Sequence, residues 1–128
     1  MATNHPVQMK ELYAVMGELG KGIPQTMAAF SKLHTAACAE GVLDAKTKEL
    51  IALGIAIVIR CNGCITCHVS DALSAGATDE EILETVGVAI LMGGGPSVVY
   101  GCEALQALKQ FKEPIHTGGN GSHDVSKN

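Results

Sequence analysis

The chain has 128 residues, of which 47% are hydrophobic and 17% charged, and its formal net charge at pH 7 is −4. This length favours one domain with a single core. The nine basic residues form no run or stripe, which argues against a nucleic-acid partner. No apolar segment follows a basic start, and the longest apolar run, residues 50–59, is too short to span a bilayer. We therefore expect a cytoplasmic protein that binds neither membranes nor nucleic acid.

The spacing of apolar residues predicts helices throughout, with no alternating strand pattern. Six helices are expected, over residues 9–19, 24–40, 46–60, 64–75, 80–92 and 97–111. The third is apolar nearly all round, which predicts a buried, central position. The fold class is therefore all-α.

Capping signals mark several of the expected boundaries. Pro24 suits the first position of the second helix, and Asp44 is expected to cap the third. Residues 62–63, Asn-Gly, should separate the third helix from the fourth. Residues 78–81 read as a capping box for the fifth. Residues 93–96, Gly-Gly-Gly-Pro, should end that helix rather than hold an anion, because no Gly-Lys-Ser/Thr follows.

These elements predict one helical domain over residues 1–111, followed by a polar, glycine-rich tail over residues 112–128 without structure of its own. The charged fraction is low for so small a chain. We therefore expect another subunit to cover part of the apolar surface.

Residues 60–71 read RCNGCITCHVSD, and their chemistry can be interpreted in several ways. Residues 64–68 match the haem attachment motif, which normally needs an exported chain and an aromatic-rich pocket, whereas this chain has two Tyr, two Phe and no Trp. An iron–sulfur cluster lacks a fourth cysteine at the usual spacing. A zinc site at Cys61, Cys64 and His68 lacks a fourth ligand. Structural cysteines beside a satisfied histidine remain a further alternative.

A redox dithiol needs the fewest additional assumptions. Cys64 falls in the first turn of the fourth expected helix, where free N–H groups and the helix dipole stabilise a thiolate. His68 lies one turn later on the same face and can accept the thiol proton. Cys61, at the end of the preceding helix, is close enough to attack an oxidised Cys64 and close a disulfide. This interpretation requires no metal and no cofactor.

Glu49, Cys61, Cys64 and His68, in the pattern E-x11-C-x-x-C-x-x-x-H, resemble the carboxymuconolactone decarboxylase-like superfamily, specifically its alkylhydroperoxidase AhpD-like branch. The resemblance covers about residues 25–111 and includes SAGATDEEI and AILMGGGP. It implies that Cys64 is oxidised to a sulfenic acid and that Cys61 is proton donor and resolving thiol. It also implies that His68 and Glu49 form a proton relay with water.

Glu49 heads an otherwise apolar stripe, and a buried carboxylate needs a partner. Twelve helical residues span about 18 Å, so Glu49 cannot reach Cys61 along its own helix. The next helix must fold back and bring His68 near it.

The chain departs from the family pattern in several respects. AhpD is a longer, two-repeat chain, and a histidine between its two cysteines is Gly63 here. Cys67 is additional, and we expect it to be idle. The lactone decarboxylases proper lack the cysteine pair, which argues against decarboxylation here.

The remaining cysteines and histidines suggest no further site. Cys38 and Cys102 lie on apolar helical stripes and are expected to be buried and inert. His34 is expected to pack on its own helix, and His116 and His123 fall in the tail without an assignable role.

The sequence thus predicts a thiol-dependent hydroperoxidase or disulfide oxidoreductase. Its substrate would be a small hydroperoxide or disulfide, and an external dithiol would reduce the oxidised protein again. The resemblance implies a homo-oligomer, either a trimer or a hexamer. The alternative is a non-redox member of the family, either a decarboxylase-like lyase or a metal-binding module.

Overall fold

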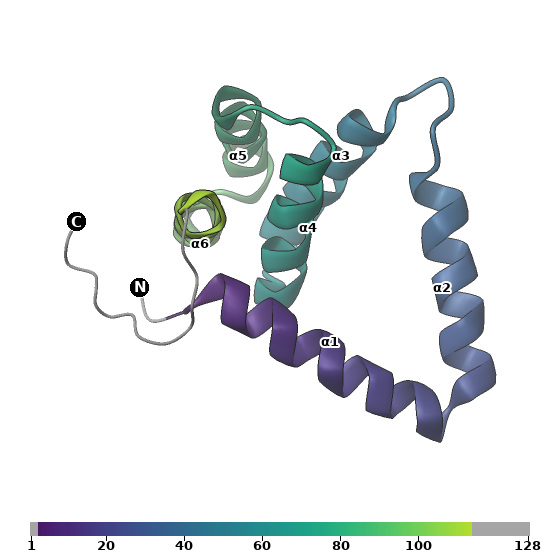
Figure 1. Cartoon of the computed structure of the whole chain (residues 1–128). Coiled ribbons are helices and arrows are strands. Elements are labelled where there is room, and N and C mark those ends of the chain that lie inside the picture. Colours follow the sequence, from purple (N-terminus) through teal and green to yellow (C-terminus); the bar gives the residue numbers. More distant parts are fainter. Residues whose placement is uncertain (1–2, 114–128) are drawn as a thin grey trace.

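The computed structural model describes residues 3–113, which contain six α-helices and no strand (Figure 1). They are α1 (His5–Gly22), α2 (Pro24–Cys38), α3 (Ala45–Val58), α4 (Asn62–Ser74), α5 (Asp79–Gly93) and α6 (Gly95–Lys112). The prediction of an all-α fold with about six helices is confirmed. The predicted tail lies outside the described residues except at its start, where Lys112 is the last residue of α6 and Glu113 its C-cap.

Local capping sets the helix boundaries. The Asp44 side chain accepts the backbone N–H of Thr47 at 2.8 Å, and Thr78 and Glu81 form the predicted capping box. α1 begins four residues earlier than the sequence pattern predicts, because the Asn4 side chain caps it and a proline occupies its first turn. The apolar spacing did not reveal this polar start.

The packed body consists of α3, α4, α5 and α6, with Leu53, Ile57, Ile65, Val69 and Ile82 at its centre. Alanines of α5 and α6 complete this core and allow the two helices to approach closely. Gly101 marks the closest approach, because a Cβ atom added there would lie 2.7 Å from Cγ1 of Val86.

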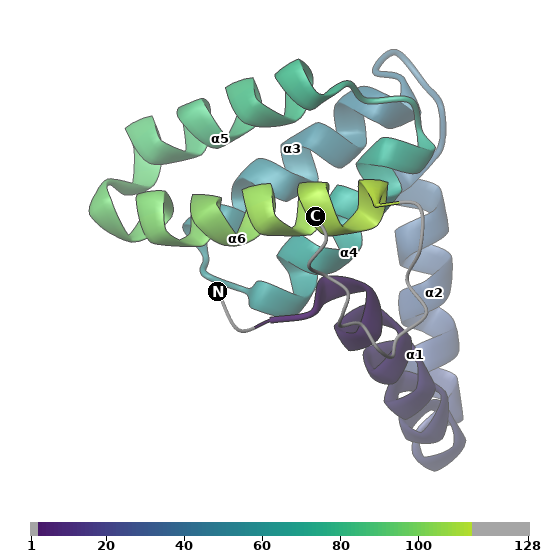
Figure 2. The same cartoon turned by 60° about the vertical axis from the view of Figure 1, so that its left-hand side comes forward.

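α1 and α2 form an arm that extends away from the body (Figure 2). The start of α1 packs on α4 and α6, whereas α2 packs mainly on α1 and less closely on α3. No residue of α2 is buried, and its Phe30 and Leu33 are exposed. The arm therefore offers apolar side chains that this single chain does not cover.

The prediction that α3 is buried nearly all round is wrong for the single chain. Glu49, Leu53, Ala56 and Ile57 are buried, but the opposite side of α3, which includes Ile51, Ile55 and Ile59, is exposed. The body packs on one side of this helix only. Within residues 3–113, none of the helices combines the length and the apolar character needed to cross a membrane.

Candidate active site

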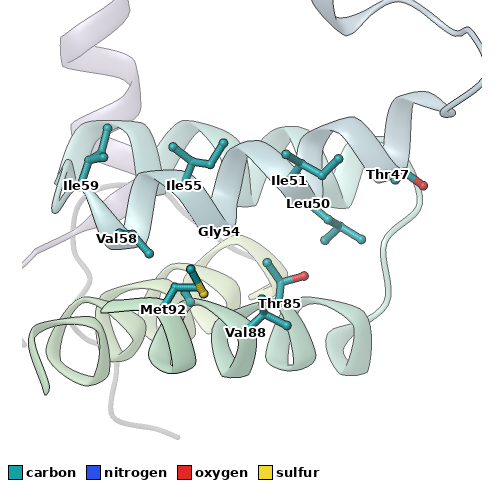
Figure 3. A pocket seen from close by; sticks show the side chains of 11 residues that line it. Thr47, Leu50, Ile51, Gly54, Ile55, Val58, Ile59, Thr85, Val88 and Met92 are labelled. Carbon is teal, nitrogen blue, oxygen red and sulfur yellow. The ribbon is translucent and has the colours of Figure 1, made fainter. Parts of the chain in front are cut away.

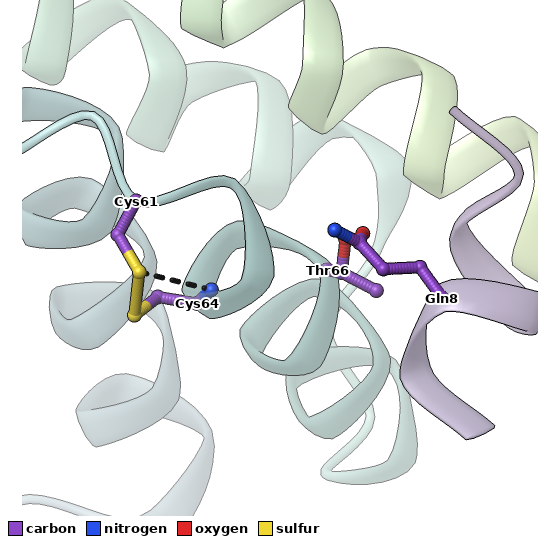
Figure 4. The surroundings of a disulfide bond; sticks show 4 residues. All are labelled: Gln8, Cys61, Cys64 and Thr66. Carbon is purple, nitrogen blue, oxygen red and sulfur yellow. Dashed lines mark hydrogen bonds between the residues drawn. A yellow bond between two sulfur atoms is a disulfide. The ribbon is translucent and has the colours of Figure 1, made fainter. Parts of the chain in front are cut away.

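A disulfide joins Cys61 and Cys64 at the start of α4, with their Cα atoms 5.2 Å apart (Figure 4). The chain leaves α3 through Arg60, whose φ of 62° is the left-handed conformation of a tight turn. Cys61 then caps α4, because its Sγ accepts the backbone N–H of Cys64 at 3.3 Å. The predicted proximity of the two cysteines is confirmed.

The boundary predicted between the two cysteines is wrong. Asn62 and Gly63 form the first turn of α4 rather than a break, and Cys61 is the N-cap of α4 rather than the end of α3. Both sulfur atoms consequently lie at the positive end of the same helix. Proximity to the helix end alone therefore does not distinguish the two thiols, and what does distinguish them is that Cys64 precedes His68 by one helical turn.

His68 and Glu49 are joined by a hydrogen bond, with 2.8 Å between Nδ1 of His68 and Oε1 of Glu49. Glu49 lies near the start of α3 and is only 7% exposed, while His68 lies in the middle of α4. α4 folds back along α3, so residues 19 positions apart in sequence meet. The expectation that Glu49 requires a partner and finds it in His68 is confirmed.

Asp71 is a third polar member of this cluster, which sequence reasoning missed. Glu49, His68 and Asp71 each offer a ligand-type atom, and these three atoms lie within 4.8 Å of one another. Burial, and then the nearby charge of Glu49, raise the pKa of Asp71, while His68 and His34 act in the opposite direction. A usable signal was present in the sequence, since Asp71 follows His68 by three residues and so shares its helix face.

Tyr13 and Cys67 lie beside this cluster. Burial, the neighbouring Cys67 thiol and the charges of Asp71 and Glu49 raise the pKa of the Tyr13 hydroxyl well above its ordinary value. Burial also raises the pKa of Cys67, which keeps that thiol protonated and poorly nucleophilic at neutral pH. This environment agrees with the expectation that Cys67 is idle.

The other two cysteines are more accessible than predicted. Cys38 is half-buried near the end of α2, where partial burial and the nearby Glu49 carboxylate raise its thiol pKa. Its Sγ lies 3.9 Å from Nε2 of His34, one turn earlier on the same helix, as expected for a histidine that packs on its own helix. Cys102 is exposed on α6. Helical spacing identified the apolar stripes correctly but could not show that this chain leaves them uncovered.

A second polar network, also missed from the sequence, holds the opposite side of α4. His5 is fully buried, and its Nδ1 lies 2.5 Å from Oγ1 of Thr66 while its Nε2 lies 3.1 Å from Oε1 of Glu103. Thr66 also donates a hydrogen bond to Gln8 at 2.5 Å (Figure 4). The network ties the start of α1 to both α4 and α6, and so fixes the helix that carries Cys64 and His68.

An open apolar groove of about 530 Å³ runs between α3 and α5 (Figure 3). Leu50 and Val58 of α3 point toward α5, while Ile51, Ile55 and Ile59 line the groove from the part of α3 turned away from α5. The predicted end of a helix within residues 93–96 is confirmed, but the break is the single residue Gly94, at a φ of 71°, because Gly93 belongs to α5 and Gly95 begins α6. Met92, near the end of α5, also lines the groove.

The fold and the site together define a small all-helical protein with a C-x-x-C disulfide at one helix start and a Glu–His pair one turn below it. The family model for carboxymuconolactone decarboxylases matches residues 24–107, and the chain belongs to the carboxymuconolactone decarboxylase family.

Solved structures support this assignment. A carboxymuconolactone decarboxylase family protein from Legionella pneumophila is 42% identical in sequence, with a TM-score of 0.82 over 85% of this chain and 97% of that one. A Thermotoga maritima family member, described as a candidate for a part in the antioxidative response, is 31% identical with a TM-score of 0.71 over 79% of this chain and 89% of that one. An uncharacterized protein of Cupriavidus necator is 38% identical over 105 residues, which are 82% of this chain and 93% of that protein.

Proposed function

We propose that this protein is a thiol-dependent peroxidase or disulfide oxidoreductase that uses Cys64, Cys61, His68 and Glu49. The observation that carries the proposal is the Cys61–Cys64 disulfide at the start of the helix that also holds His68, bonded to buried Glu49. The antioxidative description of the Thermotoga maritima relative supports the same chemistry.

The first step is attack of the Cys64 thiolate on the terminal oxygen of a hydroperoxide. The O–O bond breaks, the sulfur becomes a sulfenic acid, and the alkoxide leaving group takes a proton from the His68–Glu49 pair to leave as an alcohol. With a disulfide substrate, the same thiolate would attack sulfur and release a thiol.

The second step is attack of the Cys61 thiol on the sulfenic sulfur of Cys64. An S–S bond forms and water leaves, which gives the disulfide present in the structure. An external dithiol then reduces this bond in two exchange steps and becomes a disulfide itself. The position of both sulfur atoms at the start of α4 supports the ready formation of this bond.

Cysteine variants test the division of roles. In a peroxide-consumption assay with dithiothreitol as reductant, Cys64→Ser should abolish turnover. Cys64 is the one cysteine that lies at a helix start and also has a histidine one helical turn away. Without any added thiol, Cys61→Ser should react with one equivalent of peroxide and leave a sulfenic acid on Cys64 that dimedone traps. Cys102→Ser, which alters an exposed thiol, serves as the matched control and should keep full activity. Absence of a trapped sulfenate in Cys61→Ser, together with loss of activity in Cys67→Ser, would show that the assignment is wrong.

We infer that the chain works as a homo-oligomer, either a trimer or a hexamer. The exposed side of α3, the groove next to it and the uncovered arm of α1 and α2 together form a large apolar surface, which supports a contact between subunits. The cytoplasmic location remains a prediction from the sequence.

A further inference from the structure

Glu49, His68 and Asp71 form a group with a chemistry of its own beside the disulfide. Two helices supply the group, Glu49 from α3 and the other two from successive turns of α4, and these helices pack side by side in the body (Figure 1). Their ligand-type atoms all lie within 4.8 Å of one another. One imidazole with two carboxylates is a donor set that binds Zn²⁺ and similar divalent ions in proteins.

The charges of this group are unbalanced. Among residues 3–113, the lysine ion pairs join Lys46 to Glu81 and Lys112 to Asp79, and none reaches Glu49 or Asp71. Glu49 is 7% exposed, so its carboxylate has little water around it. Within residues 3–113, His68 is the one basic residue within ion-pair distance of Glu49. A divalent cation would offset both carboxylates at once.

The geometry requires only a small adjustment. Zinc bonds to nitrogen and oxygen of about 2.0–2.2 Å place tetrahedral ligand atoms about 3.3–3.6 Å apart. His68 and Glu49 already approach to 2.8 Å, and the largest separation in the group is within 4.8 Å. His68 and Asp71 are only partly buried, so a change of side-chain torsion angles can bring their ligand atoms about 1 Å closer, as zinc coordination requires.

We propose that Glu49, His68 and Asp71 form a reversible site for a divalent transition-metal ion, with Zn²⁺ as the probe and water in the remaining coordination positions. This site differs from the cysteine-based zinc site considered from the sequence, because it needs neither Cys61 nor Cys64. Bound Zn²⁺ holds the two relay groups and so slows peroxide consumption until a chelator removes it. Only this inhibition rests on the proposed function, since the binding itself does not.

Calorimetric titration of Zn²⁺ into the full-length disulfide form tests the binding, because Cys61 and Cys64 carry no free thiol in that form. We expect one ion per chain and a loss of affinity of at least about tenfold in Asp71→Asn. Asp79→Asn, which alters an exposed carboxylate of α5, is the matched control and should bind like the wild type. Full affinity in Asp71→Asn, or no binding by the wild type, would overturn the proposal.

The Co²⁺ spectrum of the wild-type chain gives a test that does not depend on a variant. Ligation by nitrogen and oxygen should produce d–d bands without a thiolate-to-metal charge-transfer band. A thiolate band would place the ion on a free cysteine and refute the three-residue site. If Zn²⁺ binds at this site and a chelator-reversible loss of peroxidase rate is seen, both proposals hold. Binding to a protein that shows no peroxidase activity would leave the metal site standing and refute the proposed function alone.

Discussion

Replacing Glu49 with glutamine separates a proton relay from a merely structural contact. Glu49→Gln keeps the volume and a side-chain oxygen that can hydrogen-bond to His68, now 2.8 Å away, but it removes the negative charge of the carboxylate. The chain offers a matched control, because Glu103 faces His5 at 3.1 Å in a second His–Glu pair, which does not include a residue of the proposed relay. Glu103→Gln makes the same chemical change outside the proposed relay.

The expected magnitude follows from the kind of hydrogen bond that is lost. A bond to a charged group contributes about 1.5–3 kcal/mol and a neutral one about 0.5–1.5 kcal/mol, so the change weakens the pair by about 1–1.5 kcal/mol. If that difference acts in the transition state, the rate falls by about 5–15-fold. Stability should change little or increase, because the weaker hydrogen bond to His68 is offset when a buried charge and its repulsion with the Asp71 carboxylate are removed.

The assay is kcat/KM for peroxide consumption across a pH series, together with thermal unfolding of the same samples. Glu49→Gln should be slower, with a shifted pH profile and a folded state at least as stable as the wild type. Glu103→Gln should keep the wild-type rate while its stability falls, since it removes a charged partner from fully buried His5. Equal rates in Glu49→Gln and the wild type, or an equal loss of rate in both variants, would refute the relay.

Three further outcomes follow from the fold. Burial, only partly opposed by Glu103, lowers the pKa of His5 in the folded chain, so below about pH 6.5 the unfolded chain binds the extra proton and the free energy of unfolding should fall. In His5→Gln, the free energy of unfolding measured between about pH 5 and 8 should depend less on pH, and an unchanged slope would contradict this. Ile55→Glu, on the exposed side of α3, should reduce the light-scattering mass to that of one chain, and a wild type that is already monomeric would rule out the proposed assembly. Gly101→Ala should destabilise by up to about 2 kcal/mol, because crowding against Val86 exceeds the gain in helix propensity, whereas Gly87→Ala, with open space around it, should be neutral or stabilising in the same denaturation experiment.

The sequence could predict the parts of the fold that depend on near neighbours. Helix caps and breaks involve residues a few positions apart, so the pattern showed the caps at Asp44 and Thr78 and the break near Gly94. The Glu49–His68 contact was also accessible, because a buried carboxylate needs a partner and α4 follows α3 directly. The proximity of Cys61 and Cys64 required only that a short turn connect the two helices.

Contacts between distant segments could not be predicted in this way. The partners of His5 lie 61 and 98 residues away, and no local pattern connects a polar N-terminal residue to them. The exposure of Ile55 and Cys102 depends on which side of a helix the rest of the chain covers, and helical spacing is the same for a side covered by this chain and for one left to a partner. Asp71 is a different kind of omission, since its spacing from His68 was visible but no chemistry had been assigned to it.

Two polar networks hold α4 in place relative to α1, α3 and α6. Thr66 anchors one side of the helix to α1 and α6 through His5, while His68 and Asp71 face Glu49 on α3. Between these anchors, Ile65 and Val69 are fully buried in the core. These contacts hold α4 from several sides, so they fix His68 one helical turn from Cys64, as the proposed relay requires.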